Sequence, residues 1–142
     1  MTIVGFSLTK ILLERKETPI RKLEVKSKLQ LISMERQEVK LVEGKDTLRF
    51  NFEYDIIYQP DLATISFKGY VLFVADPKYA DEIMKEWKKT KAIGKELQTN
   101  VYNFIFQKCN IKALEFEDEF GLPPHIQLPQ IKIEEIKEKD KK

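Results

Sequence analysis

An α+β fold, in which a four-stranded antiparallel sheet is followed by two helices, is the architecture that the sequence predicts. Up to about residue 75, apolar side chains alternate with polar ones, which is the two-residue period of strands with one buried face. From residue 76 to about residue 120, apolar side chains recur at spacings of three and four, which is the period of a helix. Short turns separate the alternating stretches and favour an antiparallel meander.

The first two strands are expected before residue 44. Val4–Leu13 is the first. The second has the strictest alternation in the chain, with an apolar face opposed by a polar one: Leu23, Val25, Leu29 and Leu31 against Lys22, Glu24, Lys26, Lys28 and Gln30. We expect Val39–Glu43 to continue this strand after an irregularity, up to a turn at Gly44.

Two further strands follow the turn at Gly44. The third has six apolar or aromatic residues in phase: Leu48, Phe50, Phe52, Tyr54, Ile56 and Tyr58. A turn at Gln59-Pro60-Asp61 leads to the fourth, with Ile65, Phe67, Val71 and Phe73 in phase. Gly69 occupies an apolar position of this strand, which indicates a bulge or a close approach of another backbone.

Two helices are expected in the second half of the chain. Asp76-Pro77 is a typical helix start, and we expect the first helix to run to Ile93 with Gly94 as its terminating glycine. The second should run from Lys95 to Phe120. Its apolar residues form two adjacent stripes, which is more than one contact with a sheet requires: Leu97, Val101, Phe104 and Ile111 in one, and Ile105, Cys109, Ala113, Phe116 and Phe120 in the other.

Composition excludes several classes of protein. The chain has 142 residues, of which 42% are hydrophobic and 34% charged, and these values fit one globular domain. A net charge of +2 provides no general attraction to nucleic acid or anionic membrane, and we expect neither as a partner. We find no secretion signal and no apolar run long enough to cross a bilayer. One cysteine, Cys109, suits a reducing compartment, so we expect a cytoplasmic protein.

No catalytic residues, metal site or cofactor is predicted. His125 is the only histidine and has no cysteine or carboxylate at metal-ligand spacing, so we interpret it as a surface or packing residue. Cys109 is expected to be an inert buried thiol. A group of carboxylates near the end of the second helix is interpreted as a solvated face: Glu115, Glu117, Asp118 and Glu119. A group of lysines on and after the first helix is interpreted in the same way: Lys85, Lys88, Lys89, Lys91 and Lys95.

The segment after the second helix shows a resemblance to a known family. Gly121 is followed by Pro124, then by Ile126-Gln127-Leu128, Pro129 and Ile131-Lys132-Ile133. This order of glycine, proline, alternating apolar residues, proline and alternating apolar residues, placed after four strands and two helices, resembles the bacterial export chaperone SecB and its SecB-like relatives. The likeness in architecture covers residues 3–133. We expect residues 1–133 to form one domain, followed by a charged and disordered tail over residues 134–142.

The resemblance implies a homo-oligomer, a dimer or a tetramer, with helices in the subunit interface. Since their side chains span more than one helix face, we expect four residues to form it: Phe104, Ile105, Phe116 and Phe120. It also implies a groove for unfolded, extended polypeptide. We expect the segment after the helix to form one wall of that groove, with five residues in contact with the peptide: Phe120, Leu122, Ile126, Leu128 and Ile131.

Three functions remain open at this point. The leading hypothesis is SecB-like binding of non-native or extended polypeptide without ATP and without enzymatic activity. The second is a scaffold or antitoxin-associated factor that recognises one specific protein partner. An enzyme that uses surface carboxylates ranks lowest, because apolar residues without converging polar groups do not make an active site.

Overall fold

The computed structural model describes residues 2–19 and 22–127. Within them, four strands precede two helices: β1 (Thr2–Arg15), β2 (Glu24–Gln37), β3 (Asp46–Gln59), β4 (Ala63–Ala75), α1 (Pro77–Thr90) and α2 (Lys95–Glu119). The predicted α+β fold is therefore confirmed. The predicted tail over residues 134–142 lies outside the described residues.

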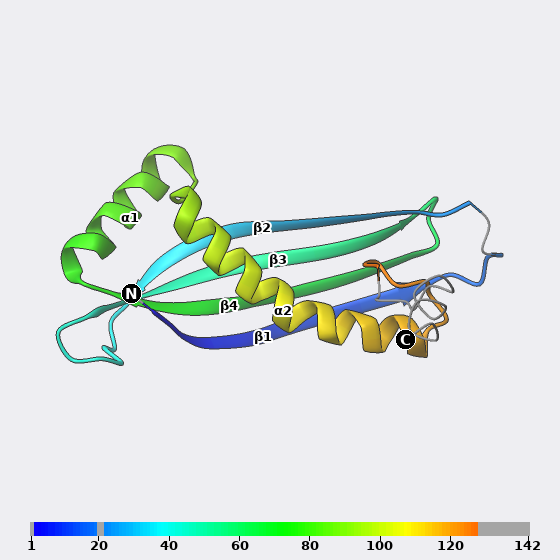
Figure 1. Ribbon diagram of the computed structural model, residues 1–142, viewed down its shortest axis with the longest axis horizontal. Helices are drawn as coiled ribbons and strands as arrows, with labels where there is room; N and C mark the ends of the chain where they lie inside the picture. Colours follow the sequence, from blue (N-terminus) through cyan, green and yellow to red (C-terminus); the bar gives the residue numbers. More distant parts are fainter. Residues whose placement is uncertain (1, 20–21, 128–142) are drawn as a thin grey trace, which may run out of the picture.

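The four strands form one antiparallel sheet with the order β1-β4-β3-β2 (Figure 1). The predicted meander holds for β2, β3 and β4, which are joined by short connections and pair with their neighbours in sequence. It is wrong for β1, which pairs with β4 and not with β2. β1 and β2, which are consecutive in the sequence, therefore lie at opposite edges of the sheet.

The glycine in β4 marks a close approach of two backbones, as its position in the apolar pattern predicts. Gly69 lies opposite Leu8, next to a register shift between Leu8 and Lys10. A Cβ atom on Gly69 would lie 2.2 Å from the backbone oxygen of Ser7. Any side chain would therefore push β1 away from β4.

The residues expected to extend β2 form a loop instead. β2 ends at Gln37, and Val39 in the following loop is 72% exposed. Asp46 begins β3, so the loop between the two strands includes the whole of 39–43. The alternation of Val39 and Leu41 with polar residues is typical of a strand. Within the described part of the chain, however, no neighbouring strand pairs with these residues.

Both helix boundaries near Gly94 differ from the prediction. α1 ends at Thr90, and Lys91 adopts the left-handed conformation (φ 58°) that was expected of a glycine. Gly94 has φ −57° and precedes the first residue of α2, so it begins the second helix rather than ending the first. The start of α1 is as predicted, with Pro77 in its first turn, although Asp76 forms no side-chain cap.

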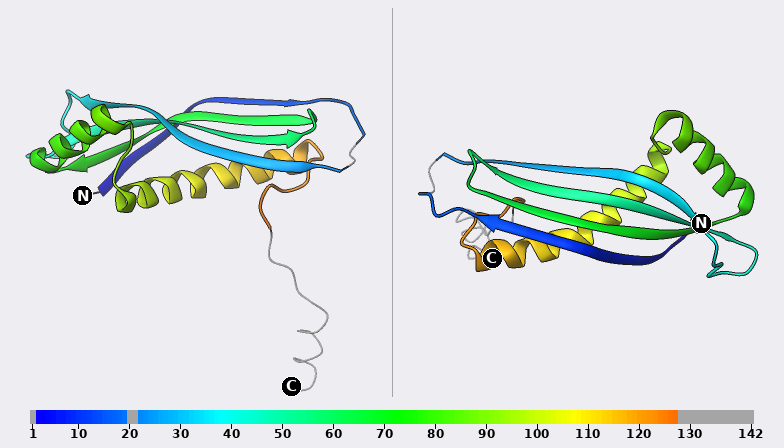
Figure 2. Two further views of the ribbon diagram at one scale, coloured as in Figure 1. Left: turned by 90° about the horizontal axis from the view of Figure 1, so that it is seen from above. Right: turned by 180° about the vertical axis from the view of Figure 1, so that it is seen from behind.

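α2 crosses the sheet obliquely and packs on one face of it (Figures 1 and 2). Its buried residues recur at every fourth position: Leu97, Val101, Ile105, Cys109, Ala113 and Glu117. Because four residues of an α-helix turn through about 400°, this series drifts by about 40° at each step. The buried face therefore winds around the helix. Ile111, which was expected on the buried stripe, is 63% exposed.

The core lies between α2 and the inward face of the sheet. The six in-phase residues of β3 are all buried, as predicted, and they contact the buried residues of β4, α1 and α2 in one continuous cluster. Aromatic pairs join the layers, with Phe106 of α2 edge-on to Tyr54 of β3 at 5.4 Å and Phe116 stacked on Phe67 of β4 at 6.4 Å. Burial of each aromatic side chain stabilises the domain by about 1.5–3 kcal/mol.

Candidate functional site

A row of three hollows follows the flank of α2 that does not face the core. The first, of 330 Å³, lies between the start of α2, the end of α1 and β2; the second, of 400 Å³, lies over the first turns of α2; the third, of 590 Å³, lies over its middle. Gln98 and Tyr102 line both of the first two, and Asn103 lines both of the last two. Together the hollows form one surface, which we call the α2 groove.

The α2 groove combines apolar side chains with amides. Its apolar and aromatic members on α2 are Tyr102, Phe106, Ile111 and Leu114, and its amide members on α2 are Gln98, Asn103, Gln107 and Asn110. An amide side chain both donates and accepts hydrogen bonds, so it can pair with a peptide backbone of any sequence. From Gln98 to Leu114 the helix rises about 24 Å, which matches about seven residues of extended polypeptide.

The segment after α2 turns back along the helix and contributes to the groove. α2 ends in a turn in which the backbone N–H of Leu122 donates to the carbonyl oxygen of Glu117 at 2.8 Å. Gly121 adopts φ 65°, a conformation that a glycine reaches without steric cost. The chain then runs antiparallel to α2, and Ile126 lines the third hollow. We call residues 121–127 the return segment.

A buried polar cluster attaches the return segment to the body of the protein. His125 Nδ1 lies 2.8 Å from Glu117 Oε1, and His125 Nε2 lies 2.8 Å from Asn110 Oδ1. Tyr58 donates its hydroxyl to the other carboxylate oxygen of Glu117, and Tyr54 donates to Asn110 Oδ1 at 2.9 Å. The side chains of His125 and Glu117 are each 1% exposed. The imidazole therefore bridges two turns of α2 and fixes the direction of the return segment.

Burial dominates the acid–base properties of the two tyrosines in this cluster. It raises the pKa of the Tyr58 hydroxyl far above its ordinary value, and the hydrogen bond to Glu117 raises it further. Burial likewise raises the pKa of Tyr54 to about 12. Tyr58 also lies 2.7 Å from the carbonyl oxygen of Pro123, so its single proton serves one of two acceptors at a time. Both tyrosines remain neutral donors at physiological pH.

Comparisons with known proteins identify the fold. No protein-family model matches the chain, and no curated protein matches it either. Among solved structures, the chain is similar to the Mycobacterium tuberculosis Rv1957 SecB-like chaperone, solved in complex with a ChAD peptide from the Rv1956 HigA1 antitoxin. The match has a TM-score of 0.52 and 14% sequence identity, and it covers 92% of this chain and 90% of the other. The fold is SecB-like.

The SecB-like fold places the five predicted peptide contacts in three situations. Phe120 and Ile126 lie at the surface, with 41% and 39% of their area exposed. Leu122 is buried in the subunit core at 6% exposure, so a peptide in the groove does not reach it. Leu128 and Ile131 lie outside the described residues. Peptide contact at Phe120 and Ile126 therefore stays a prediction. The sequence reasoning did not name the amides and aromatic residues of α2, which their spacing of four from Gln98 through Tyr102, Phe106 and Asn110 indicates.

The four predicted interface residues also differ in how much of their surface one subunit leaves exposed. Ile105 has no exposed surface within one subunit, so it is a core residue and offers nothing to a neighbour. Phe104 lies edge-on to Phe6 at 5.9 Å, and Phe116 stacks on Phe67, so both are half-buried within the subunit. Phe120, at the end of α2, remains available.

Two interpretations of the polar residues need correction. Glu117 is buried at 1% exposure, whereas Glu115, Asp118 and Glu119 are exposed as predicted. Its distance of four residues from Ala113 continues the buried series of α2, and this was the signal that could have identified it. His125 does have a carboxylate partner, Glu117, which folding rather than local spacing brings to it.

The remaining candidate groups are inert or solvated. Cys109 is buried as predicted, and burial raises the pKa of its thiol to about 12. The five lysines on and after α1 are all exposed. Within residues 2–19 and 22–127, no three potential ligands come close enough together to hold a metal ion. Neither described helix is long and apolar enough to span a bilayer.

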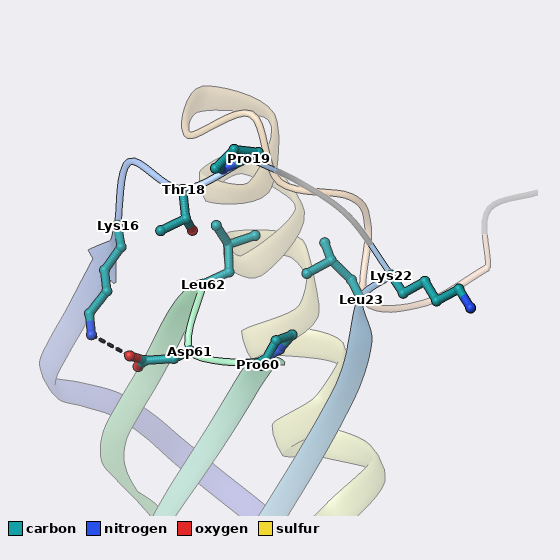
Figure 3. Close-up of a pocket in the computed structure, with 8 residues that line it drawn as sticks. All are labelled: Lys16, Thr18, Pro19, Lys22, Leu23, Pro60, Asp61 and Leu62. Atoms are coloured by element: carbon teal, nitrogen blue, oxygen red, sulfur yellow. Dashed lines mark hydrogen bonds and ion pairs between the residues drawn. The ribbon is translucent and has the colours of Figure 1, made fainter.

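A separate hollow of 590 Å³ lies at the end of the sheet near the β3–β4 turn (Figure 3). Leu23, Pro60 and Leu62 provide much of its apolar wall, and Lys16 pairs with Asp61 at 2.5 Å beside it. None of its lining residues belongs to α2, so it is distinct from the α2 groove. One ion pair within an aliphatic wall provides no group poised for catalysis.

Proposed function

We propose that this protein binds non-native or extended polypeptide in the α2 groove, without ATP and without enzymatic chemistry. The row of three neighbouring hollows is the observation that carries this proposal, since its apolar side chains and amides lie along one helix over the length of about seven residues of extended peptide. Aromatic and aliphatic surfaces accept varied side chains, while the amides satisfy backbone groups that any sequence possesses.

The similar structure supports a second candidate. The Rv1957 SecB-like chaperone is described in complex with a peptide from an antitoxin. A protein of this fold can therefore bind one specific partner segment, and we propose the partner-specific role as the alternative. A chaperone should bind many unfolded chains with similar affinity, whereas a dedicated factor should prefer one sequence.

We also propose that the protein is a cytoplasmic homo-oligomer. Phe120, at the end of α2, is a large apolar residue that a single subunit leaves exposed to water. A neighbouring subunit that covers it would remove this apolar surface from solvent. A stable monomer in light scattering at micromolar concentration would contradict this proposal.

Ile111→Asp should weaken binding of an unfolded client about tenfold or more, because it places an unpaired charge in the apolar floor of the third hollow. Ile57→Asp is the matched control, since Ile57 is 37% exposed and points to the opposite face of the sheet from its buried neighbour Ile56. The measurement is fluorescence anisotropy of a labelled, reduced and carboxymethylated protein, without nucleotide.

If Ile111→Asp and Ile57→Asp lose affinity equally, or if neither variant loses affinity, the α2 groove is not the binding site. A panel of unrelated unfolded clients then separates the two candidate functions. Affinities within one order of magnitude support the chaperone role, and a single tight binder supports the specific partner.

A further inference from the structure

The charge of the α2 groove changes from one end to the other. Lys91 lines the first hollow and Lys95 lines the second, and both side chains are exposed. Among the described residues that line the three hollows, none carries a carboxylate. The described lining of the third hollow has no charged side chain, and its apolar members are Phe106, Ile111, Leu114 and Ile126. The groove therefore has a cationic end and an apolar end.

The backbone between the two helices holds Lys91 beside the first hollow. Lys91 adopts φ 58°, and its backbone N–H donates to the carbonyl oxygen of Trp87 at 2.8 Å. Gln30 of β2 and Gln98 of α2 line the same hollow. An acidic side chain placed here would meet one ammonium group and two amides that can donate hydrogen bonds to its oxygens.

The carboxylates nearest this end of the groove do not pair with its two lysines. Within residues 2–19 and 22–127, no carboxylate lies within salt-bridge distance of the ammonium group of Lys91 or Lys95. The pKa of Tyr79 is raised by burial and then by the charges of three nearby carboxylates: Glu96, Glu82 and Glu86. Tyr79 lines none of the three hollows, so these carboxylates gather away from the groove.

The opposite end of α2 carries exposed carboxylates: Glu115, Asp118 and Glu119. From Lys95 to Glu119 the helix spans about 36 Å, which is several times the Debye length of about 8 Å at physiological salt. The two ends of the groove therefore act on a bound peptide independently. An acidic residue is attracted at the end near Lys95 and repelled at the end near Glu119.

We propose that the α2 groove selects extended segments that carry acidic residues at one end and large apolar residues at the other, with Lys91 and Lys95 as the residues that determine this preference. From Lys95 to Ile111 the helix rises about 24 Å, so about five extended residues separate the acidic from the apolar positions. This inference rests on the proposed function, because it names the class of segment that the same groove binds.

A pair of labelled peptides tests the preference on the intact chain. Each carries two aspartates, a spacer of about five serine and glycine residues and two leucines, and its partner has asparagine in place of both aspartates. Both orders are made, because side-chain amides accept a peptide in either chain direction, and the tighter order is used. The aspartate peptide should bind about threefold to tenfold more tightly, which is the range expected of two exposed ion pairs.

The double variant Lys91→Gln/Lys95→Gln should bind the two peptides equally. Lys85→Gln/Lys89→Gln is the matched control, because it removes the same charge from exposed residues of α1 that line none of the three hollows. The control should keep the preference. The preference should also shrink in about 1 M salt, where the Debye length is about 3 Å.

Three results would overturn the proposal. Equal binding of the two peptides by the wild-type chain would show that the groove does not read charge. A preference that persists in Lys91→Gln/Lys95→Gln would assign it to other residues. An equal loss in both double variants would reduce it to the net charge of the protein.

Unfolded clients and Ile111→Asp separate this inference from the proposed function. If the two peptides bind equally and Ile111→Asp abolishes their binding, the groove stands as the binding site and the charge preference is wrong. If the aspartate peptide binds through Lys91 and Lys95 but no unfolded client binds, the preference stands and the chaperone role fails. If neither peptide binds, both proposals are wrong.

Discussion

The two ends of the sheet are joined to their helices by different kinds of interaction. At one end, exposed ion pairs link α1 to β2 and to the β2–β3 loop: Arg36 with Asp81 at 2.5 Å, and Lys45 with Asp76. At the other end, the buried cluster of Tyr58, Glu117 and His125 links β3, α2 and the return segment.

The exposed ion pairs are not what holds α1 on the body of the protein, whereas the buried cluster does hold the return segment there. α1 would remain in place without its ion pairs, because Ala80, Ile83 and Trp87 bury its inner face against the core. The return segment depends on polar partners, since Leu122 is its buried apolar anchor and His125 and Pro123 contact the body through hydrogen bonds. A buried carboxylate that loses its partners costs far more than an exposed one.

Among substitutions at the two ends of the sheet, Glu117→Ala should lower the free energy of unfolding most. Removing the carboxylate leaves the Tyr58 hydroxyl and His125 Nδ1 without their common partner in a site closed to water, and each buried polar group left unsatisfied costs about 1–3 kcal/mol. The measurement is urea unfolding followed by circular dichroism.

Glu119→Ala is the matched control, because Glu119 is exposed in the same turn of α2. Its free energy of unfolding should change by less than about 0.5 kcal/mol. If the two variants unfold at the same urea concentration, the buried cluster is not a structural attachment.

The sequence predicts the elements of this fold well where local physics decides them. The alternation in β3 is matched by six buried side chains, and Asp76-Pro77 begins a helix as such a pair should. Val39 shows the limit of this reasoning, because alternation predicts a strand only where a partner strand is available to pair with it. Likewise, Lys91 accepts the conformation expected of Gly94, since tertiary packing decides where α1 stops.

The candidate site was harder to predict, because its polar members are distant in sequence. Tyr58 and Glu117 are brought together by the packing of α2 on β3, and no spacing within the chain reveals their hydrogen bond. A glutamate beside Asp118 and Glu119 is typical of a solvated face, and only the continued four-residue series from Ala113 indicates burial. Ile126 lines the third hollow, and the peptide contact that its place in the tail pattern implied stays a prediction.

His125→Ala should have a smaller and more local effect than Glu117→Ala. It removes the link between the return segment and two turns of α2, but Glu117 keeps its hydrogen bond from Tyr58. A lost buried hydrogen bond costs about 1–3 kcal/mol. Amide exchange should therefore accelerate over residues 121–127 and remain unchanged in β3 and β4.

Gln127→Ala is the control for His125→Ala, since Gln127 is exposed in the same segment. Faster exchange throughout the sheet in His125→Ala would mean that the imidazole supports the whole core. Unchanged exchange in the return segment would mean that Leu122 alone holds it.

Asp81→Asn and Asp76→Asn, at the exposed end, should have the smallest effects. Arg36 lowers the pKa of Asp81 and Lys45 lowers the pKa of Asp76, chiefly through hydrogen bonds. A carboxylate whose pKa is lowered by folding stabilises the folded state above its unfolded pKa of about 3.9, and this contribution disappears as the pH falls through the folded value. Any stability difference between the wild-type chain and either variant should therefore be present at pH 7, shrink below pH 4, and also shrink in about 1 M salt, where the Debye length is about 3 Å.

Thermal unfolding at two pH values and two salt concentrations measures this stability difference. A difference that persists at low pH would show that these carboxylates act through packing rather than charge, and the contrast between the two ends of the sheet would then be wrong.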